Sequence, residues 1–251
     1  MSFENKVVIV TGASSGIGAS TAVLFSKEKA NVVLVGRNET KLNEVAALCV
    51  TKRLIIKADV SNEADVKNIV EQTVKEFGRI DVLVNNAGFV RYGSVGMGNI
   101  LSAYDEVMAT NVRAVLHLTS LCVDHLIESK GNIVNISSIG GQIPPTKPLL
   151  MPYCISKAAL NFITQSIALE LGEHGVRVNA VSPGPVVTNF LKNSGIPETT
   201  FTWKDFESGT LLKRIGEPEE IADLIMFLAS DKAKSITGSN YISDNGYLLN
   251  R

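Results

Sequence analysis

The stretch KVVIVTGASSGIGAS, residues 6–20, joins a short apolar run to a helical pattern through a turn with three glycines. The β-branched residues of 7–10 favour a buried strand. Gly12, Gly16 and Gly18 would permit a tight turn, close approach of the backbone to a pyrophosphate, and close packing of helix on strand. We therefore predict the first strand-to-helix connection of a nucleotide-binding fold. An ordinary glycine-containing turn is the plainer alternative, because the G-x-x-x-G-x-G spacing matches G-x-G-x-x-G only loosely.

The rest of the chain alternates short apolar runs with longer amphipathic stretches. Further strands are predicted at 31–36, 53–60, 80–88, 132–138, 176–184 and 240–243, and helices at 16–28, 39–47, 63–77, 100–129, 153–173 and 217–229. Continuous apolar strands are typical of a parallel sheet that is covered on both faces. The pattern predicts a single-domain α/β chain over residues 1–251, a doubly wound Rossmann-type parallel sheet in three α/β/α layers.

Composition excludes several functional classes. The 251 residues are 45% hydrophobic and carry a formal net charge of −1, without a run of like charges. We therefore expect no nucleic-acid partner and no membrane partner. Cys49, Cys122 and Cys154 are scattered and odd in number, which argues against disulfides and against a metal cluster. No secretory signal is visible at the N-terminus, so we expect a cytoplasmic protein.

Arg37 follows the second predicted strand, where the adenosine ribose is held in dinucleotide-binding folds. An acid at this point would bind the ribose hydroxyls, whereas an arginine accommodates a 2′-phosphate. We therefore expect NADP to be preferred, with NAD possible and a solvated arginine as the plainer interpretation. Asp59, at the end of the third predicted strand, would face the adenine or serve the start of the next helix.

Two long irregular stretches, residues 140–152 and 183–211, interrupt the alternation. Loops of this length in a compact domain are commonly lids or binding loops. A substrate lid is expected at about 185–212, and its large apolar residues are Phe190, Leu191, Ile196, Phe201, Trp203, Phe206, Leu211 and Leu212. Such a lid would select a bulky apolar ketone or secondary alcohol, of steroid or terpenoid size. Packing against the domain or a second subunit would explain the same residues.

Tyr153 precedes Lys157 by four residues in a predicted helix, so the phenol and the ammonium share one face. A free phenol has a pKa near 10, and a neighbouring cation favours the phenolate. We expect Lys157 to lower the pKa of Tyr153, together with an oxidised nicotinamide when one is bound.

Six motifs in order resemble the short-chain dehydrogenase/reductase family over essentially the whole chain. They are TGASSGIG, NNAG at 85–88, Asn111, NISS at 135–138, YCISK at 153–157 and SPGPVVT at 182–188. The resemblance implies hydride transfer to or from a nicotinamide coenzyme, a small-molecule ketone or alcohol as substrate, and a homo-oligomer, either a tetramer or a dimer. An apolar face on the helix of Tyr153 would serve that assembly.

The same resemblance implies the site residues. Tyr153 would exchange a proton with the substrate oxygen, Ser138 would donate a hydrogen bond to that oxygen, and Asn111 would hold a water that links Lys157 to solvent. The positions expected to contact coenzyme are Gly12, Ser14, Ser15, Gly16, Ile17, Gly18, Arg37, Asp59, Val60, Asn85, Ala87, Gly88, Tyr153, Lys157, Pro183, Gly184, Val186 and Thr188.

The chain departs from the family pattern at three points. The interval from Ser138 to Tyr153 is longer than usual, so Ser137 would take the place of Ser138 if the loop shifts register. Ser15 stands where many NADP-preferring members carry a basic residue. Near the C-terminus, ISDNGYLL replaces the commoner Asp-Gly-Gly ending, which leaves the shape of the last loop open.

Overall fold

The computed structural model describes residues 2–145, 147–193 and 203–250. Its centre is a seven-stranded, fully parallel sheet in the order β3-β2-β1-β4-β5-β6-β7. The strands are β1 (Val7–Thr11), β2 (Asn31–Gly36), β3 (Arg53–Lys57), β4 (Val82–Asn85), β5 (Asn132–Ile136), β6 (Arg177–Pro183) and β7 (Asn240–Ser243). The chain adds strands outward from β1 to β3 and then returns to place β4 on the other side of β1. That reversal creates a ligand-binding crevice at the carboxyl ends of β1 and β4.

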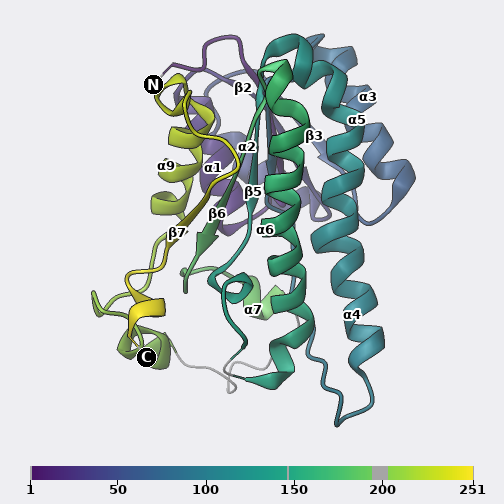
Figure 1. Cartoon of the computed structure of the whole chain (residues 1–251). Helices are drawn as coiled ribbons and strands as arrows, with labels where there is room; N and C mark the ends of the chain where they lie inside the picture. Colours follow the sequence, from purple (N-terminus) through teal and green to yellow (C-terminus); the bar gives the residue numbers. More distant parts are fainter. Residues whose placement is uncertain (1, 146, 194–202, 251) are drawn as a thin grey trace.

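Helices cover both faces of the sheet, as predicted (Figure 1). The helices are α1 (Gly16–Lys27), α2 (Glu39–Leu48), α3 (Glu63–Phe77), α4 (Ile100–Met108), α5 (Ala114–Ser129), α6 (Met151–Leu171), α7 (Phe190–Asn193), α8 (Trp203–Ser208) and α9 (Pro218–Ala229). Alternate strand residues face opposite ways: Val8 and Val10 pack with α1 and α9, whereas Val7 and Ile9 pack with α3, α5 and α6. The three-layer Rossmann-type architecture is thereby confirmed.

The predicted helix at 100–129 contains an irregularity. A π-helical turn, Ala109–Arg113, separates α4 from α5. The wider turn accommodates one extra residue, and such turns are common at functional sites. Here it carries the buried side chain of Asn111.

The long stretches at 140–152 and 183–211 contain only short helical turns in their described parts, including α7 and α8. Cys49, Cys122 and Cys154 are buried free thiols. Among the helices of the described residues, none combines the length and the apolar character that crossing a bilayer requires.

Candidate active site

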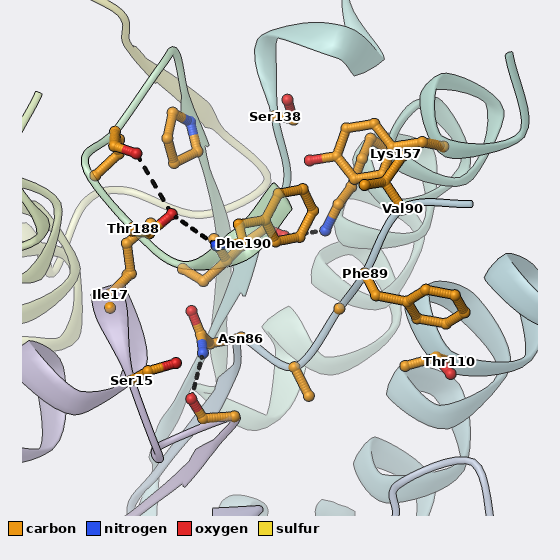
Figure 2. A pocket seen from close by; sticks show the side chains of 18 of the residues that line it. Ser15, Ile17, Asn86, Phe89, Val90, Thr110, Ser138, Lys157, Thr188 and Phe190 are labelled. Atoms are coloured by element: carbon orange, nitrogen blue, oxygen red, sulfur yellow. Dashed lines mark hydrogen bonds between the residues drawn. The ribbon is translucent and has the colours of Figure 1, made fainter. Parts of the chain in front are cut away.

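A cavity of about 930 Å³ lies at the carboxyl edge of the sheet, where the loops that follow β1 to β6 converge. It is lined by most of the predicted site residues: Gly12, Ser14, Ser15, Gly16, Ile17, Arg37, Asp59, Val60, Ala87, Gly88, Ser138, Tyr153, Lys157, Pro183, Gly184, Val186 and Thr188. Figure 2 shows Ser15 and Ile17 in one part of this cavity and Ser138, Lys157 and Phe190 in another.

In the glycine-rich turn, Gly12 and Gly16 line the cavity with backbone atoms that no side chain covers. Gly12 and Gly16 have φ values of +66° and +54°, a conformation that side chains rarely adopt. A Cβ atom on Gly18 would collide with the carbonyl oxygen of Gly12, so this glycine allows α1 to pack closely on the turn. The N–H groups that begin α1 are positioned to receive an anion. The cradle therefore fits the pyrophosphate of a dinucleotide.

The turn after β1 is tied to the segment after β4. The Thr11 hydroxyl accepts hydrogen bonds from the backbone N–H groups of Asn86 and Ala87, both at 3.0 Å. The Asn86 amide donates to the carbonyl of Thr11 at 2.8 Å, and Asn86 lines the cavity. Asn85 was predicted to line the cavity, but it does not. Its buried amide donates to Asn135 at 2.9 Å, because successive strand residues point to opposite faces.

Charged side chains gather where the adenosine of a dinucleotide would lie. Arg37 is largely exposed, and its Nη1 is 3.7 Å from Oδ2 of Asp59. Hydrogen bonds from Ser61 and the charge of Arg37 outweigh the opposing effect of burial and lower the pKa of Asp59. Lys41 and Lys57 also line this end, with Lys57 Nζ 3.9 Å from Oε2 of Glu39. The end therefore carries both cations and acids.

Tyr153 lies in the first turn of α6, is half-buried and lines the cavity. Burial raises the pKa of Tyr153 to about 12, although a hydrogen bond with the Ser138 hydroxyl opposes that rise. The expectation of a lowered pKa is therefore not met in the chain by itself, because desolvation of the phenolate exceeds the effect of its neighbours. The phenol is therefore protonated at neutral pH.

Lys157 is held against the end of β5. Its ammonium donates to the carbonyl of Ile136 at 2.7 Å, and its own carbonyl accepts from the Ser137 hydroxyl at 3.1 Å. The Nζ atom is 5.7 Å from the centroid of the Tyr153 ring, and burial lowers the pKa of Lys157 to about 8.

Asn111 lies behind the cavity wall and does not line it. Its amide donates to the carbonyl of Phe89 and to the Ser156 hydroxyl, both at 3.0 Å, and its Oδ1 accepts from Phe89 N at 3.1 Å. A Cβ atom on Gly88 would be 3.2 Å from Asn111 Oδ1 and 3.5 Å from Lys157 Nζ. Both polar atoms therefore border the space that the missing side chain leaves.

The longer loop does not shift the serine register. Ser138 is the serine whose hydroxyl acts to lower the pKa of the Tyr153 phenol, whereas Ser137 is buried and bonded to the backbone of α6. Ser138 also caps the short turn Ile139–Gly141 by accepting from Gly140 N at 3.1 Å.

Part of the predicted lid lines the cavity. The ring of Phe190 is 5.7 Å from the ring of Tyr153, and Phe206 also faces the cavity. Leu211 and Leu212 are 49% and 64% exposed and lie outside the cavity wall. Ile196 and Phe201 are outside the described residues, and the side chains of Leu191 and Trp203 are not described.

Several cavity residues were not predicted individually. An apolar wall comes from the 140–152 stretch and its neighbours, through Ile139, Ile143, Pro144, Pro145, Leu150 and Cys154. The length of that loop was the available signal. Tyr247, from the C-terminal segment, also lines the cavity, and no motif pointed to it.

Comparisons with known proteins agree along the whole chain. A family model described as enoyl-(acyl carrier protein) reductase matches residues 12–248. An uncharacterized oxidoreductase of Thermotoga maritima is 39% identical, over 98% of this chain and 98% of that protein. Glucose 1-dehydrogenase of Gluconobacter oxydans is 38% identical, over 98% and 93%.

Among solved structures, a short-chain dehydrogenase/reductase of unknown function from Caenorhabditis elegans, solved with cofactor, is 37% identical. It superimposes with a TM-score of 0.92 and covers 99% of this chain and 97% of that one. Together with the glycine cradle and the placement of Ser138, Tyr153 and Lys157, these matches show that the chain belongs to the short-chain dehydrogenase/reductase family of NAD(P)-dependent oxidoreductases.

Proposed function

We propose that the enzyme is an NADP-dependent carbonyl reductase for bulky apolar ketones of steroid or terpenoid size, and that it oxidises the matching secondary alcohols in reverse. The observation that carries the proposal is the placement of Tyr153, Ser138 and Lys157 in one cavity with an apolar wall, where Lys157 Nζ is 5.7 Å from the centroid of the Tyr153 ring. A cytoplasmic location is part of the proposal, supported by the three free thiols, which suit a reducing compartment.

Tyr153 is the general acid in the direction of reduction. With its pKa near 12 the phenol is protonated at neutral pH and delivers its proton to the carbonyl oxygen. Ser138 donates a hydrogen bond to that oxygen as negative charge develops on it. The hydride to the carbonyl carbon would come from a nicotinamide coenzyme held by the glycine-rich turn and Lys157.

Lys157 and Asn111 support the proton donor. The Lys157 ammonium would hold the nicotinamide ribose of a bound coenzyme, and it adds positive charge near the phenol, which eases release of its proton. Asn111 Oδ1 and Lys157 Nζ border the space beside Gly88, where a water would connect the ammonium to solvent.

The cationic side chains at the adenosine end support NADP. Arg37, Lys41 and Lys57 line the adenosine end, and a guanidinium suits a 2′-phosphate. Asp59 and Glu39 oppose them, and the ion pair between Arg37 and Asp59 favours the alternative of an NAD-dependent alcohol dehydrogenase, with the Asp59 carboxylate near the ribose hydroxyls.

The lining supports an apolar substrate. Large apolar side chains line the cavity, including Phe89, Val90, Ile139, Ile143, Leu150, Phe190 and Phe206, and the Phe190 ring is in contact with that of Tyr153. The glucose 1-dehydrogenase relative favours a polyol instead. A non-catalytic nucleotide-binding scaffold is the third possibility, and the presence of all four residues Asn111, Ser138, Tyr153 and Lys157 argues against it.

Steady-state reduction of decalone and of glucose-derived ketoses, each with NADPH and with NADH, tests the proposal. We expect decalone with NADPH to give the highest kcat/KM. Tyr153→Phe should lower kcat by at least about a hundredfold, since general acid catalysis contributes roughly that much, and leave NADPH binding intact by calorimetry.

Arg37→Asp provides the control at the coenzyme end. It should shift the NADPH/NADH ratio of kcat/KM toward NADH without a change in the substrate order. Full turnover by Tyr153→Phe would refute the mechanism, and faster turnover of ketoses than of decalone would refute the substrate class.

A further inference from the structure

The C-terminal segment after β7 forms a turn whose shape is fixed by its own sequence. The Asp244 carboxylate accepts from the backbone N–H groups of Gly246 and Leu248 at 2.9 and 2.8 Å. Asn245 and Gly246 have φ values of 53° and 77°, which asparagine and glycine tolerate. A short 3₁₀ turn, Tyr247–Leu249, follows. The departure from the usual family ending thus builds a rigid structure, called here the DNGY turn (residues 244–247).

The DNGY turn joins two walls of the active-site cavity. On one side, Gly184 N donates to the carbonyl of Ser243 at 2.9 Å, and a Cβ atom on Gly184 would be 2.7 Å from Asp244 Cα. On the other side, the carbonyl of Asn245 accepts from Leu211 N and Leu212 N at 3.0 and 3.2 Å. The turn therefore fixes the segment that follows α8 relative to the loop that follows β6.

Tyr247 extends from this turn to the cavity. A Cβ atom on Gly209 would be 2.8 Å from Cε2 and 3.3 Å from Cδ2 of the Tyr247 ring. Gly209 does not have a positive φ, so the ring and not the backbone excludes a side chain there. Tyr247 and Phe206 both line the cavity that contains Tyr153. The ring therefore packs against Gly209 and lines the same cavity as Tyr153.

We propose that Tyr247 is a specificity-determining residue, whose ring limits the size of the ketone that reaches Tyr153. The inference rests on the proposed carbonyl reduction and adds the residue that sets its upper size limit. The aromatic ring of Tyr247, and not its hydroxyl, sets this size limit. Gly209 contributes to the same size limit, because the space that it leaves determines the position of the Tyr247 ring in the cavity.

Relative kcat/KM for cyclohexanone, decalone and a steroid ketone, measured with NADPH, tests this role. Tyr247→Ala should raise the ratio of steroid ketone to cyclohexanone roughly tenfold, the scale of discrimination that a pocket wall gives against a larger apolar group. Tyr247→Phe should keep the wild-type ratio. Gly209→Ala should change the ratio at least threefold with Tyr247 present and leave it unchanged in the Tyr247→Ala background.

Leu249→Ala is the matched control, because Leu249 lies in the same 3₁₀ turn but is 80% exposed. It should leave all ratios at the wild-type value. An unchanged ratio in Tyr247→Ala, with normal thermal unfolding and normal NADPH affinity, would overturn the assignment while wild-type ketone reduction stands. Absence of ketone reduction by the wild type would instead refute the proposed function.

Discussion

Lys157 illustrates how one residue serves function at the expense of stability. Below pH 8 the folded chain holds a desolvated ammonium that the unfolded chain leaves in water, which is why its pKa is lowered to about 8. Lys157→Met should abolish ketone reduction yet raise the free energy of unfolding at pH 7 by up to about 3 kcal/mol, at 1.4 kcal/mol per pKa unit. Urea unfolding measures the difference.

The same linkage fixes the sign of the pH dependence. Between pH 8 and the unfolded value near 10.4 the unfolded state binds more protons at this site, so wild-type stability rises with pH there. The advantage of Lys157→Met should therefore shrink over that range. Lys232→Met, at an exposed position, controls for the added methionine. A stability difference that is constant from pH 7 to pH 10 would contradict this account.

At the scale of elements, Asp81 fastens the beginning of β4 to the beginning of β1. Its buried carboxylate accepts from Val7 N at 2.9 Å, from Lys6 Nζ at 3.0 Å, and from Nε and Nη2 of Arg79 at 2.7 and 2.6 Å. These hydrogen bonds outweigh burial and lower the pKa of Asp81. Asp81→Asn should reduce the free energy of unfolding at neutral pH by roughly 3 kcal/mol, since buried donors lose their charged acceptor.

Acid should remove the same contribution from the wild type. The stabilisation is complete above the unfolded pKa near 3.9 and is lost as pH falls through the lower folded value. Urea midpoints of wild type and Asp81→Asn should therefore converge toward the acid limit. Glu4→Gln, in an exposed pair with Lys29, is the control and should change little. Equal stability of Asp81→Asn and wild type at neutral pH would refute the role.

At the scale of the whole molecule, α6 carries an apolar stripe on its outer side. Ile155, Phe162 and Leu169 recur every seven residues and are 41%, 72% and 87% exposed. This stripe supports the proposed homo-oligomer. Sedimentation at micromolar concentration should show a dimer or larger species for the wild type, and Phe162→Glu should shift it toward monomer. A monomeric wild type would exclude assembly through α6.

Much of this molecule is predictable from the chain because its strands are continuous apolar runs. The helix 63–77 and the strand 240–243 were predicted at their observed bounds. The pattern did not predict the π-turn around Asn111, because a helix with one extra residue keeps a helical apolar pattern.

The sequence pointed to the cavity lining where polar or glycine residues follow a strand end, as at Gly12 and Ser138, and where helical spacing pairs Tyr153 with Lys157. The sequence did not predict those properties of the site that depend on the burial of a side chain. The pKa of Tyr153 depends on desolvation, which no local sequence pattern encodes. Tyr247 lines the cavity beside Gly209, and the preceding Asp244 packs against Gly184; both contacts join residues that are remote in sequence.

The attachment of Lys157 to β5 has an evolutionary consequence. Its ammonium and its carbonyl are both bonded at the end of that strand, to Ile136 and Ser137. The chemical machinery is therefore anchored in the most deeply buried layer, while Phe190, Phe206 and Tyr247 belong to peripheral segments. Substitutions in those peripheral segments could therefore change which substrate the protein accepts while the residues anchored to β5 stay in place.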